Sequence, residues 1–266
     1  MSLRRPQLSL CLMVLCIVTA CSTSPTGRTQ LTLFPSAEID AMGDASYAQM
    51  KDATPVLPEG EVTAYVRCVA QPLLRQVGGD WEITVFHDDQ VNAFALPGNN
   101  IGIYTGLLGV ASNQHQLAAV VGHEIGHVLA EHANARLSTS FATQAGLDLL
   151  GAVTGSGNSF MGQQVMAALG VGAQIGILLP FSRGQESEAD IIGLQMMADA
   201  GFDPREAVQL WRNMEASSGG NKPPELLSTH PASQTRIQRL EAAMPDALAR
   251  FEAARRAGRR PDCSLL

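Results

Sequence analysis

Apolar and polar positions along the chain follow two different periods. Between Glu61 and Val77 the apolar side chains recur every three or four residues, which predicts an amphipathic helix. The run WEITVFH, from Trp81 to His87, alternates residue by residue and contains β-branched side chains, which predicts a strand. Two more short strands are predicted over 92–96 and 101–104, joined by the turn sequence PGNN. We therefore expect an α+β fold that is mostly helical and has one small β-sheet.

Helical patterns occupy much of the remaining chain. A helix is predicted over 35–53, with Ser36 as its N-cap and the break TPVLPEG behind it. A glycine stop followed by Asp203 and Pro204 predicts another over 205–216. The stretch 217–229 is rich in glycine and proline and predicts a mobile loop. Two terminal helices are expected, over 231–243 and 246–257.

One helical segment is apolar except for the sequence HEIGH. Residues four apart lie on one helix face, so His123 and His127 can reach the same ion, with Glu124 beside them. The pattern H-E-x-x-H is typical of sites where two histidines hold zinc and the glutamate acts as general base on a zinc-bound water. Buried histidines and a surface glutamate are the alternative. The apolar neighbours favour a metal, because polar groups in a core helix need partners.

A catalytic zinc site needs three protein ligands, so one must come from elsewhere. The histidines after the motif are His132 and His230. The longer motif H-x-x-G-x-x-H is absent because His132 has the wrong spacing, which disfavours a site of three histidines. A downstream glutamate is the alternative third ligand.

Two segments next to the motif allow alternative interpretations. The predicted sheet either only packs the core or presents an exposed edge, with which an extended peptide can pair beside the metal. Residues 137–182 carry Asp148 as their only formal charge. A membrane span there would separate the motif from later ligands, so we expect apolar helices that cover the site, facing lipid or substrate, or a plain buried helix pair.

Composition sets the size and excludes one class of partner. The chain has 266 residues, of which 45% are hydrophobic, and a formal net charge of -7. This is enough for one globular domain with a substantial core. The acidic balance gives no basic footprint, so we do not expect nucleic-acid binding.

The first 20 residues have the features of a signal peptide, with two arginines before an apolar run. They end in Val18-Thr19-Ala20-Cys21, which resembles a bacterial lipobox and predicts lipid modification of Cys21. An uncleaved anchor helix is the alternative, but the run is short for a span of about 20 residues. Ser22 rather than aspartate after the cysteine implies the periplasmic side of the outer membrane. We expect a lipidated tether over 21–34, a catalytic domain over 35–257 and a tail over 258–266.

Cleavage there would leave Cys68 and Cys263 as the thiols that carry no lipid. An even pair in an oxidising compartment favours a disulfide between an early helix and the tail. Two unpaired buried cysteines are the alternative.

The sequence HEIGHVLAEH, followed by SRGQESEAD, resembles the metallopeptidase family of the CAAX prenyl endopeptidase and HtpX. The likeness is strongest to its bacterial periplasmic lipoprotein branch, with LoiP and BepA. The family's second motif is E-x-x-x-D on a helix. It implies Glu186 as third ligand, in a gluzincin-type domain with one Zn²⁺ per chain, and Asp190 as hydrogen-bond partner of a liganding imidazole. A solvated acidic helix start is the alternative for these carboxylates.

Two more segments carry the resemblance. His230-Pro231 with Arg236 matches the family pattern H-P-x-x-x-x-R. This implies that His230 lies near the metal, capping it or assisting the reaction, and that Arg236 holds the site or polarises the carbonyl; a loop histidine and a surface arginine are the alternative. The sequence NAFALPG resembles the family's edge strand, although Asn99 and Asn100 replace its glycine-rich turn.

The resemblance implies peptide-bond hydrolysis. Zinc would lower the pKa of its water to about 7, and Glu124 would take the proton and return it to the leaving amine. His230 or Arg236 would face the oxyanion. Unfolded or misassembled envelope proteins are the expected substrates. The alternatives are a zinc-containing chaperone or assembly factor for outer-membrane proteins, with weak or gated proteolysis, and an inert anchored protein.

Overall fold

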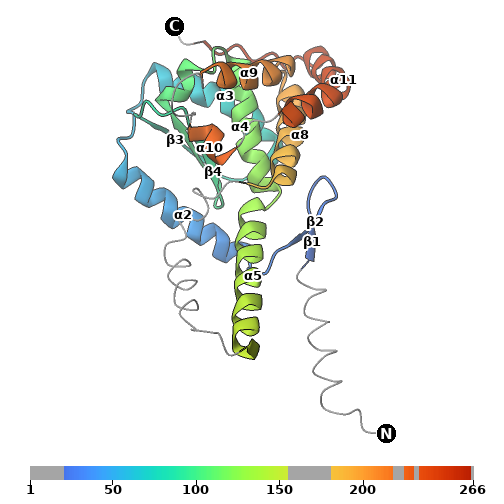
Figure 1. Cartoon of the computed structure of the whole chain (residues 1–266). Helices are drawn as coiled ribbons and strands as arrows, with labels where there is room; N and C mark the ends of the chain where they lie inside the picture. Colours follow the sequence, from blue (N-terminus) through green and yellow to red (C-terminus); the bar gives the residue numbers. More distant parts are fainter. Residues whose placement is uncertain (1–20, 155–180, 218–224, 231–233, 265–266) are drawn as a thin grey trace.

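The computed structural model describes residues 21–154, 181–217, 225–230 and 234–264, and helices pack around a small sheet in it (Figure 1). At the centre lies α4 (Gln114–Leu129), which carries the HEIGH sequence and contacts helices on several sides as well as the sheet. The helices around it are α3 (Glu61–Val77), α8 (Arg183–Ala200), α9 (Arg205–Ser217) and α5 (His132–Thr154). The predicted mostly helical α+β fold is confirmed.

The sheet has three strands in the order β3 (Glu82–Phe86), β5 (Asn100–Tyr104), β4 (Ala93–Leu96). β3 is parallel to β5, and β4 pairs with β5 as the predicted antiparallel hairpin. Its turn needs left-handed backbone at Gly98 and Asn99, whose φ angles are 84° and 65°. β4 forms an edge of this sheet and packs against α4, so the strand edge and the HEIGH helix are neighbours.

Apolar burial divides into a large cluster and a small aromatic one. The large cluster includes both faces of α4 and the apolar side of α3. The small one covers the other face of the sheet with α2 (Ser36–Ala53) and comprises Tyr47, Phe86, Phe94, Leu96 and Tyr104. The Tyr47 hydroxyl donates to the carbonyl of Ile101 at 2.8 Å, which pins α2 to β5. The sheet is therefore buried on both faces.

Glycines let α4 and α8 approach at backbone distance. A methyl group on Gly193 would lie 2.6 Å from the backbone nitrogen of His123, and one on Gly126 would lie 3.0 Å from the carbonyl oxygen of Ala189. The close crossing brings Glu186 and Asp190 of α8 toward the two motif histidines of α4. The packing of two helix backbones thus sets the distance between the halves of the candidate site.

Gly193→Ala is expected to destabilise the chain because its methyl group meets backbone atoms rather than a flexible side chain. We expect a loss of about 1–3 kcal/mol in the free energy of unfolding, typical of overpacked cores, measured by urea denaturation. Gly109→Ala is the matched control, because a methyl group there meets nothing within 4 Å. Equal stability of the two variants would contradict the close crossing.

Several predicted element boundaries were wrong. The two terminal helices form one helix, α11 (Gln234–Arg256), which passes through Pro245, because proline can bend a helix without ending it. The predicted mobile loop contains a short helix, α10 (Glu225–Thr229), while 218–224 and 231–233 lie outside the described residues. Ser36 is the first residue of α2 rather than its N-cap, and its hydroxyl donates to Glu131 at 3.2 Å.

Residues before α2 form an antiparallel hairpin of β1 (Cys21–Thr23) and β2 (Thr29–Leu31), within the expected tether. Figure 1 shows it beside the start of α8 and α5. Gln30 donates from Nε2 to the carbonyl of Ala130 at 2.8 Å, which fixes the hairpin at the junction of α4 and α5. The expected signal peptide, residues 1–20, lies outside the described residues.

The C-terminal tail is linked covalently to an early helix. A disulfide joins Cys68 in α3 to Cys263 in the tail across 195 residues of sequence, and this is the pair that the sequence favoured.

Of the apolar segment 137–182, the part up to Thr154 belongs to α5, and 155–180 lies outside the described residues. None of the described helices combines the length and the apolar character needed to cross a membrane.

Candidate metal centre

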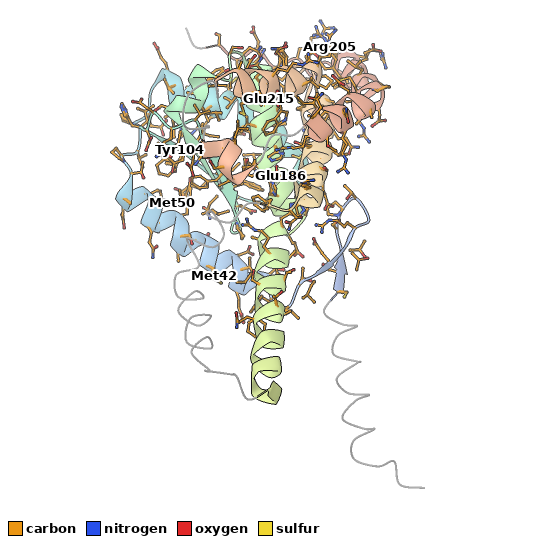
Figure 2. All side chains as sticks on the ribbon, viewed as in Figure 1. Met42, Met50, Tyr104, Glu186, Arg205 and Glu215 are labelled. Atoms are coloured by element: carbon orange, nitrogen blue, oxygen red, sulfur yellow. A yellow bond between two sulfur atoms is a disulfide. The ribbon has the colours of Figure 1, made fainter. Side chains whose placement is uncertain are left out.

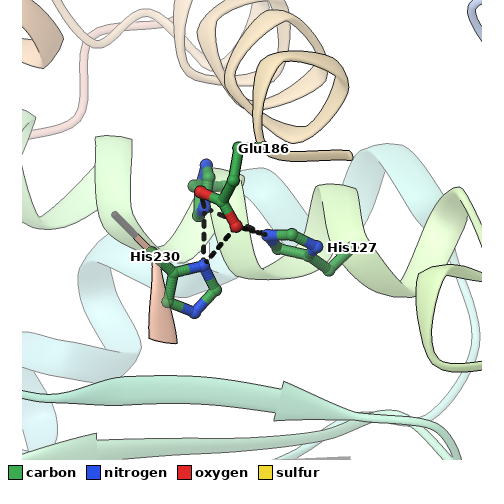
Figure 3. Close-up of side chains that lie close together, drawn as sticks. His127, Glu186 and His230 are labelled. Atoms are coloured by element: carbon green, nitrogen blue, oxygen red, sulfur yellow. Dashed lines mark hydrogen bonds and ion pairs between the residues drawn. The ribbon is translucent and has the colours of Figure 1, made fainter. Parts of the chain in front are cut away.

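Four buried side chains from three parts of the chain converge on one point (Figure 3). His123 and His127 come from α4, Glu186 comes from α8 and His230 directly follows α10, and one ligand atom of each lies within 4.8 Å of all the others. The Nε2 atom of His123 is 3.1 Å from Nε2 of His127 and 3.2 Å from Nδ1 of His230. Glu186 Oε1 is 3.0 Å from that Nδ1 and 3.5 Å from His127 Nε2.

The distances between these ligand atoms fit a metal ion with tetrahedral coordination. Ligand atoms at about 2.0–2.2 Å from zinc lie about 3.4 Å from one another in a tetrahedron, close to the separations observed. Two imidazoles and a carboxylate are the zinc ligands of a gluzincin-type site, and the fourth atom here belongs to His230. The residues therefore fit zinc, and His123, His127, Glu186 and His230 are the side chains that could hold it.

Asp190 and Arg236 lie behind His123. The Nδ1 atom of His123 is 3.0 Å from Asp190 Oδ1, so Nδ1 carries the proton and Nε2 faces the cluster. Arg236 donates to both oxygens of Asp190, at 2.7 Å from Nε and 2.6 Å from Nη2. It also ion-pairs with Glu186 at 2.7 Å and stacks on Trp211, with Cζ 3.8 Å from the ring centroid. These contacts support a holding role for Arg236.

His132 and Phe181 contact His127 from the other side. Nδ1 of His132 lies 2.8 Å from Nδ1 of His127, and its Nε2 lies 3.2 Å from Glu188 Oε2. Phe181 stacks on the imidazole of His127, with ring centroids 3.7 Å apart. Burial lowers the pKa of His132 to about 4, although Glu188 acts in the opposite direction, so this imidazole is neutral at pH 7.

The pKa values of Glu186 and His123 are shifted in opposite directions from their usual values. Burial alone would raise the pKa of Glu186, but hydrogen bonds from His123 and His230 hold it well below its usual value, so Glu186 is ionised and could serve as a charged ligand. In His123, hydrogen bonds to Asp190 and Glu186 outweigh burial and raise the pKa to about 9. A positive charge is thus favoured at the point where these side chains meet.

Glu124 lies beside the cluster with one oxygen available. Its side chain is buried, and among the described residues its Oε1 atom has no hydrogen-bond partner. Nε2 of His230, at 3.6 Å, is too distant for a hydrogen bond. Burial raises the pKa of Glu124, and the nearby His230 and His123, together with a backbone hydrogen bond from Ala95 in β4, partly offset this. An oxygen without a hydrogen-bond partner among the described residues leaves Glu124 suited to accept and release a proton.

A cavity of about 200 Å³ adjoins the cluster. It extends from His127 to the edge strand β4 and to α2 and α5. Its lining is mixed, with apolar side chains and the charged residues Asp40, Glu131 and Arg136.

The structure brings together every residue that the sequence proposed for the site. His123, Glu124, His127, Glu186 and His230 form the cluster and its base, with Asp190 and Arg236 behind them. No sequence pattern indicated Trp211 or Phe181, and His132 was expected only as a possible ligand. The adjacency of His132 to the motif was a signal, but no helical periodicity relates it to His127.

Comparison with known proteins gives a family and several relatives. The model of "Peptidase family M48" matches residues 57–244. The mitochondrial metalloendopeptidase OMA1 of Schizosaccharomyces pombe is 35% identical over 201 residues, covering 71% of this chain and 55% of that protein. The beta-barrel assembly-enhancing protease of Yersinia pestis is 34% identical over 206 residues, which cover 74% of this chain and 42% of that protein. The protein of that name from Escherichia coli is 29% identical over 203 residues, which cover 74% of this chain and 42% of that protein.

The match includes the HEIGH helix, Glu186 with Asp190, and His230 with Arg236. The chain spans about half the length of the curated relatives it matches. The extent of the family match and the buried cluster lead to the same conclusion. The chain belongs to Peptidase family M48.

Proposed function

We propose that this protein is a zinc metalloendopeptidase that hydrolyses peptide bonds in unfolded or misassembled proteins of the bacterial envelope. The observation that carries the proposal is the buried cluster of His123, His127 and Glu186 with Glu124 beside it. A zinc ion held by the three ligands would supply Lewis acidity that activates water and polarises a peptide carbonyl.

The side chains of the chain itself account for the proton transfers. Glu124 takes a proton from the attacking water at Oε1, the oxygen that has no hydrogen-bond partner among the described residues, and delivers it to the leaving amine. Asp190 and Arg236 keep His123 in one orientation, so its Nε2 stays directed at the cluster. Because Arg236 is engaged by both carboxylates, His230 is the better placed of the two candidates to face the developing oxyanion.

The edge strand supports an extended peptide as substrate. β4 is at the edge of its sheet and adjoins both α4 and the cavity beside His127. A peptide paired with this edge would lie along the HEIGH helix, and the cavity would take one of its side chains. Recognition through backbone hydrogen bonds suits unfolded chains, since it depends little on the amino-acid sequence of the substrate.

The bacterial lipoprotein branch, with lipid on Cys21 and a site at the periplasmic side of the outer membrane, is part of the proposal. Its support is the lipobox-like sequence and the likeness to beta-barrel assembly-enhancing proteases. Cys21 is exposed at the start of β1, where an acyl chain would not disturb the core.

Metal removal tests the enzyme directly. The purified chain is expected to cleave an unfolded protein such as casein, to lose this activity after dialysis against a zinc chelator, and to regain it when zinc but not magnesium is added. Product peptides measured over time report the activity. Cleavage that persists in protein shown by elemental analysis to be free of metal would refute the proposal.

One observation favours a second candidate, a chaperone or assembly factor with gated proteolysis. Nδ1 of His230 stands with the ligand atoms, where it would occupy the position that substrate or water needs. His230→Ala separates the candidates when casein cleavage is measured with zinc bound. An increase indicates that His230 gates the site, and a decrease indicates that His230 assists the reaction.

A further inference from the structure

Glu188 is a buried carboxylate with no part in the cluster or in the proposed proton transfers. It lies two residues after Glu186 on α8, and its side chain is 3% exposed. The Thr26 hydroxyl donates to its Oε1 at 2.6 Å, and Arg28 donates from Nε to its Oε2 at 2.7 Å. On its other side it meets His132. Glu188 thus connects the β1–β2 hairpin to the metal centre.

The direction of the hydrogen bonds follows from the donors and acceptors. An ionised carboxylate only accepts, so Nε2 of His132 carries the proton and donates to Glu188 across 3.2 Å. A neutral His132 then has a lone pair at Nδ1, which must accept from Nδ1 of His127, 2.8 Å away. His127 is left with its lone pair at Nε2, directed at Glu186 and His123.

The same arrangement supports His123, but it is shorter and lies within the core. There Asp190 accepts directly from Nδ1 and is held by the buried Arg236. For His127 the carboxylate lies one imidazole farther away, and the arginine that holds it is Arg28 from the hairpin. Each liganding imidazole is therefore oriented by a carboxylate that an arginine neutralises.

We propose that the hairpin from Cys21 to Leu31 is a positioning element of the metal site. Thr26 and Arg28 hold Glu188, and Glu188 and His132 together set the tautomer and ring orientation of His127. Gln30 fixes the hairpin at Ala130, between His127 and His132, so the hairpin is attached next to this relay. The inference rests on the metal-binding part of the proposed function.

Zinc affinity tests the relay without using activity. The double variant Thr26→Val/Arg28→Met removes two of the donors that the partly exposed hairpin directs at Glu188, while the Ser24 side chain remains. In chelator competition with the full chain, we expect its zinc dissociation constant to rise about 10- to 100-fold, as for other outer partners of zinc ligands. Arg28→Lys, which keeps the positive charge, should raise the zinc dissociation constant less than the double variant does. Arg67→Met, which breaks an exposed ion pair with Glu59, is the matched control and should bind as the unchanged chain does.

Nitrogen-15 NMR of the zinc-bound chain gives an independent readout. His132 should carry its proton on Nε2 in the unchanged chain, and this preference should weaken in the double variant. An unchanged zinc dissociation constant in the double variant, or a His132 protonated at Nδ1 in the unchanged chain, would overturn the inference. Failure of the unchanged chain to bind zinc would overturn this inference and the proposed function together, whereas tight binding by both chains would overturn this inference alone.

Discussion

Glu124→Gln is expected to remove most peptide hydrolysis while zinc stays bound. Glutamine keeps the shape of the side chain but cannot take a proton from water, and a positioned general base contributes about 10²- to 10⁴-fold to such reactions. Glu124 is buried and is not one of the grouped ligand residues, so the cluster should persist. We expect kcat/KM for a casein-derived peptide to fall by about that factor, with zinc content unchanged by elemental analysis.

Glu215→Gln is the matched control, since Glu215 is exposed on α9 (Figure 2). It makes the same chemical change outside the site and should leave the rate unaltered. Equal cleavage by the Glu124 variant and the unchanged chain would refute the role of this carboxylate as general base.

Glu186→Gln is expected to eliminate tight zinc binding, and with it activity. An amide replaces the charged oxygen that completes the two imidazoles, although Arg236 keeps Asp190 as a partner and the fold should survive. We expect the zinc dissociation constant from chelator competition to rise more than about 100-fold, beyond the range for partners outside the ligand set. Circular dichroism of the zinc-free variant checks the fold.

Glu188→Gln is the comparison for this change, on the same helix two residues later. Its amide oxygen can still accept from His132, so the loss of affinity should be the smaller one. If Glu188→Gln weakened zinc binding as much as Glu186→Gln, the assignment of Glu186 as the third ligand would be wrong.

Helix geometry explains why so much of the site could be predicted from the sequence. The four-residue spacings His123 to His127 and Glu186 to Asp190 place each pair on one helix face, whatever the fold around them. The hairpin of β4 and β5 followed from turn chemistry at Gly98 and Asn99 in the same local way. That the two helices meet came only from the family resemblance, and its structural basis is the close approach at Gly193.

Contacts across the chain were out of reach of local patterns. The junction between α4 and α5 passes through Glu131 in a left-handed conformation with φ of 51°, which no sequence period signals, and it places His132 against His127. The β1–β2 hairpin has strands of three residues and a polar sequence, so nothing distinguished it from a tether. Its partner Glu188 lies 160 residues beyond Arg28.

Anomalous diffraction at the zinc edge, from crystals grown with zinc, tests the glutamate-completed metal site most directly. We predict a single strong peak bounded by Nε2 of His123, Nε2 of His127 and the carboxylate of Glu186. A peak bound by Glu188 or His132 in place of Glu186, or no zinc peak between the two motif histidines, would contradict the assignment.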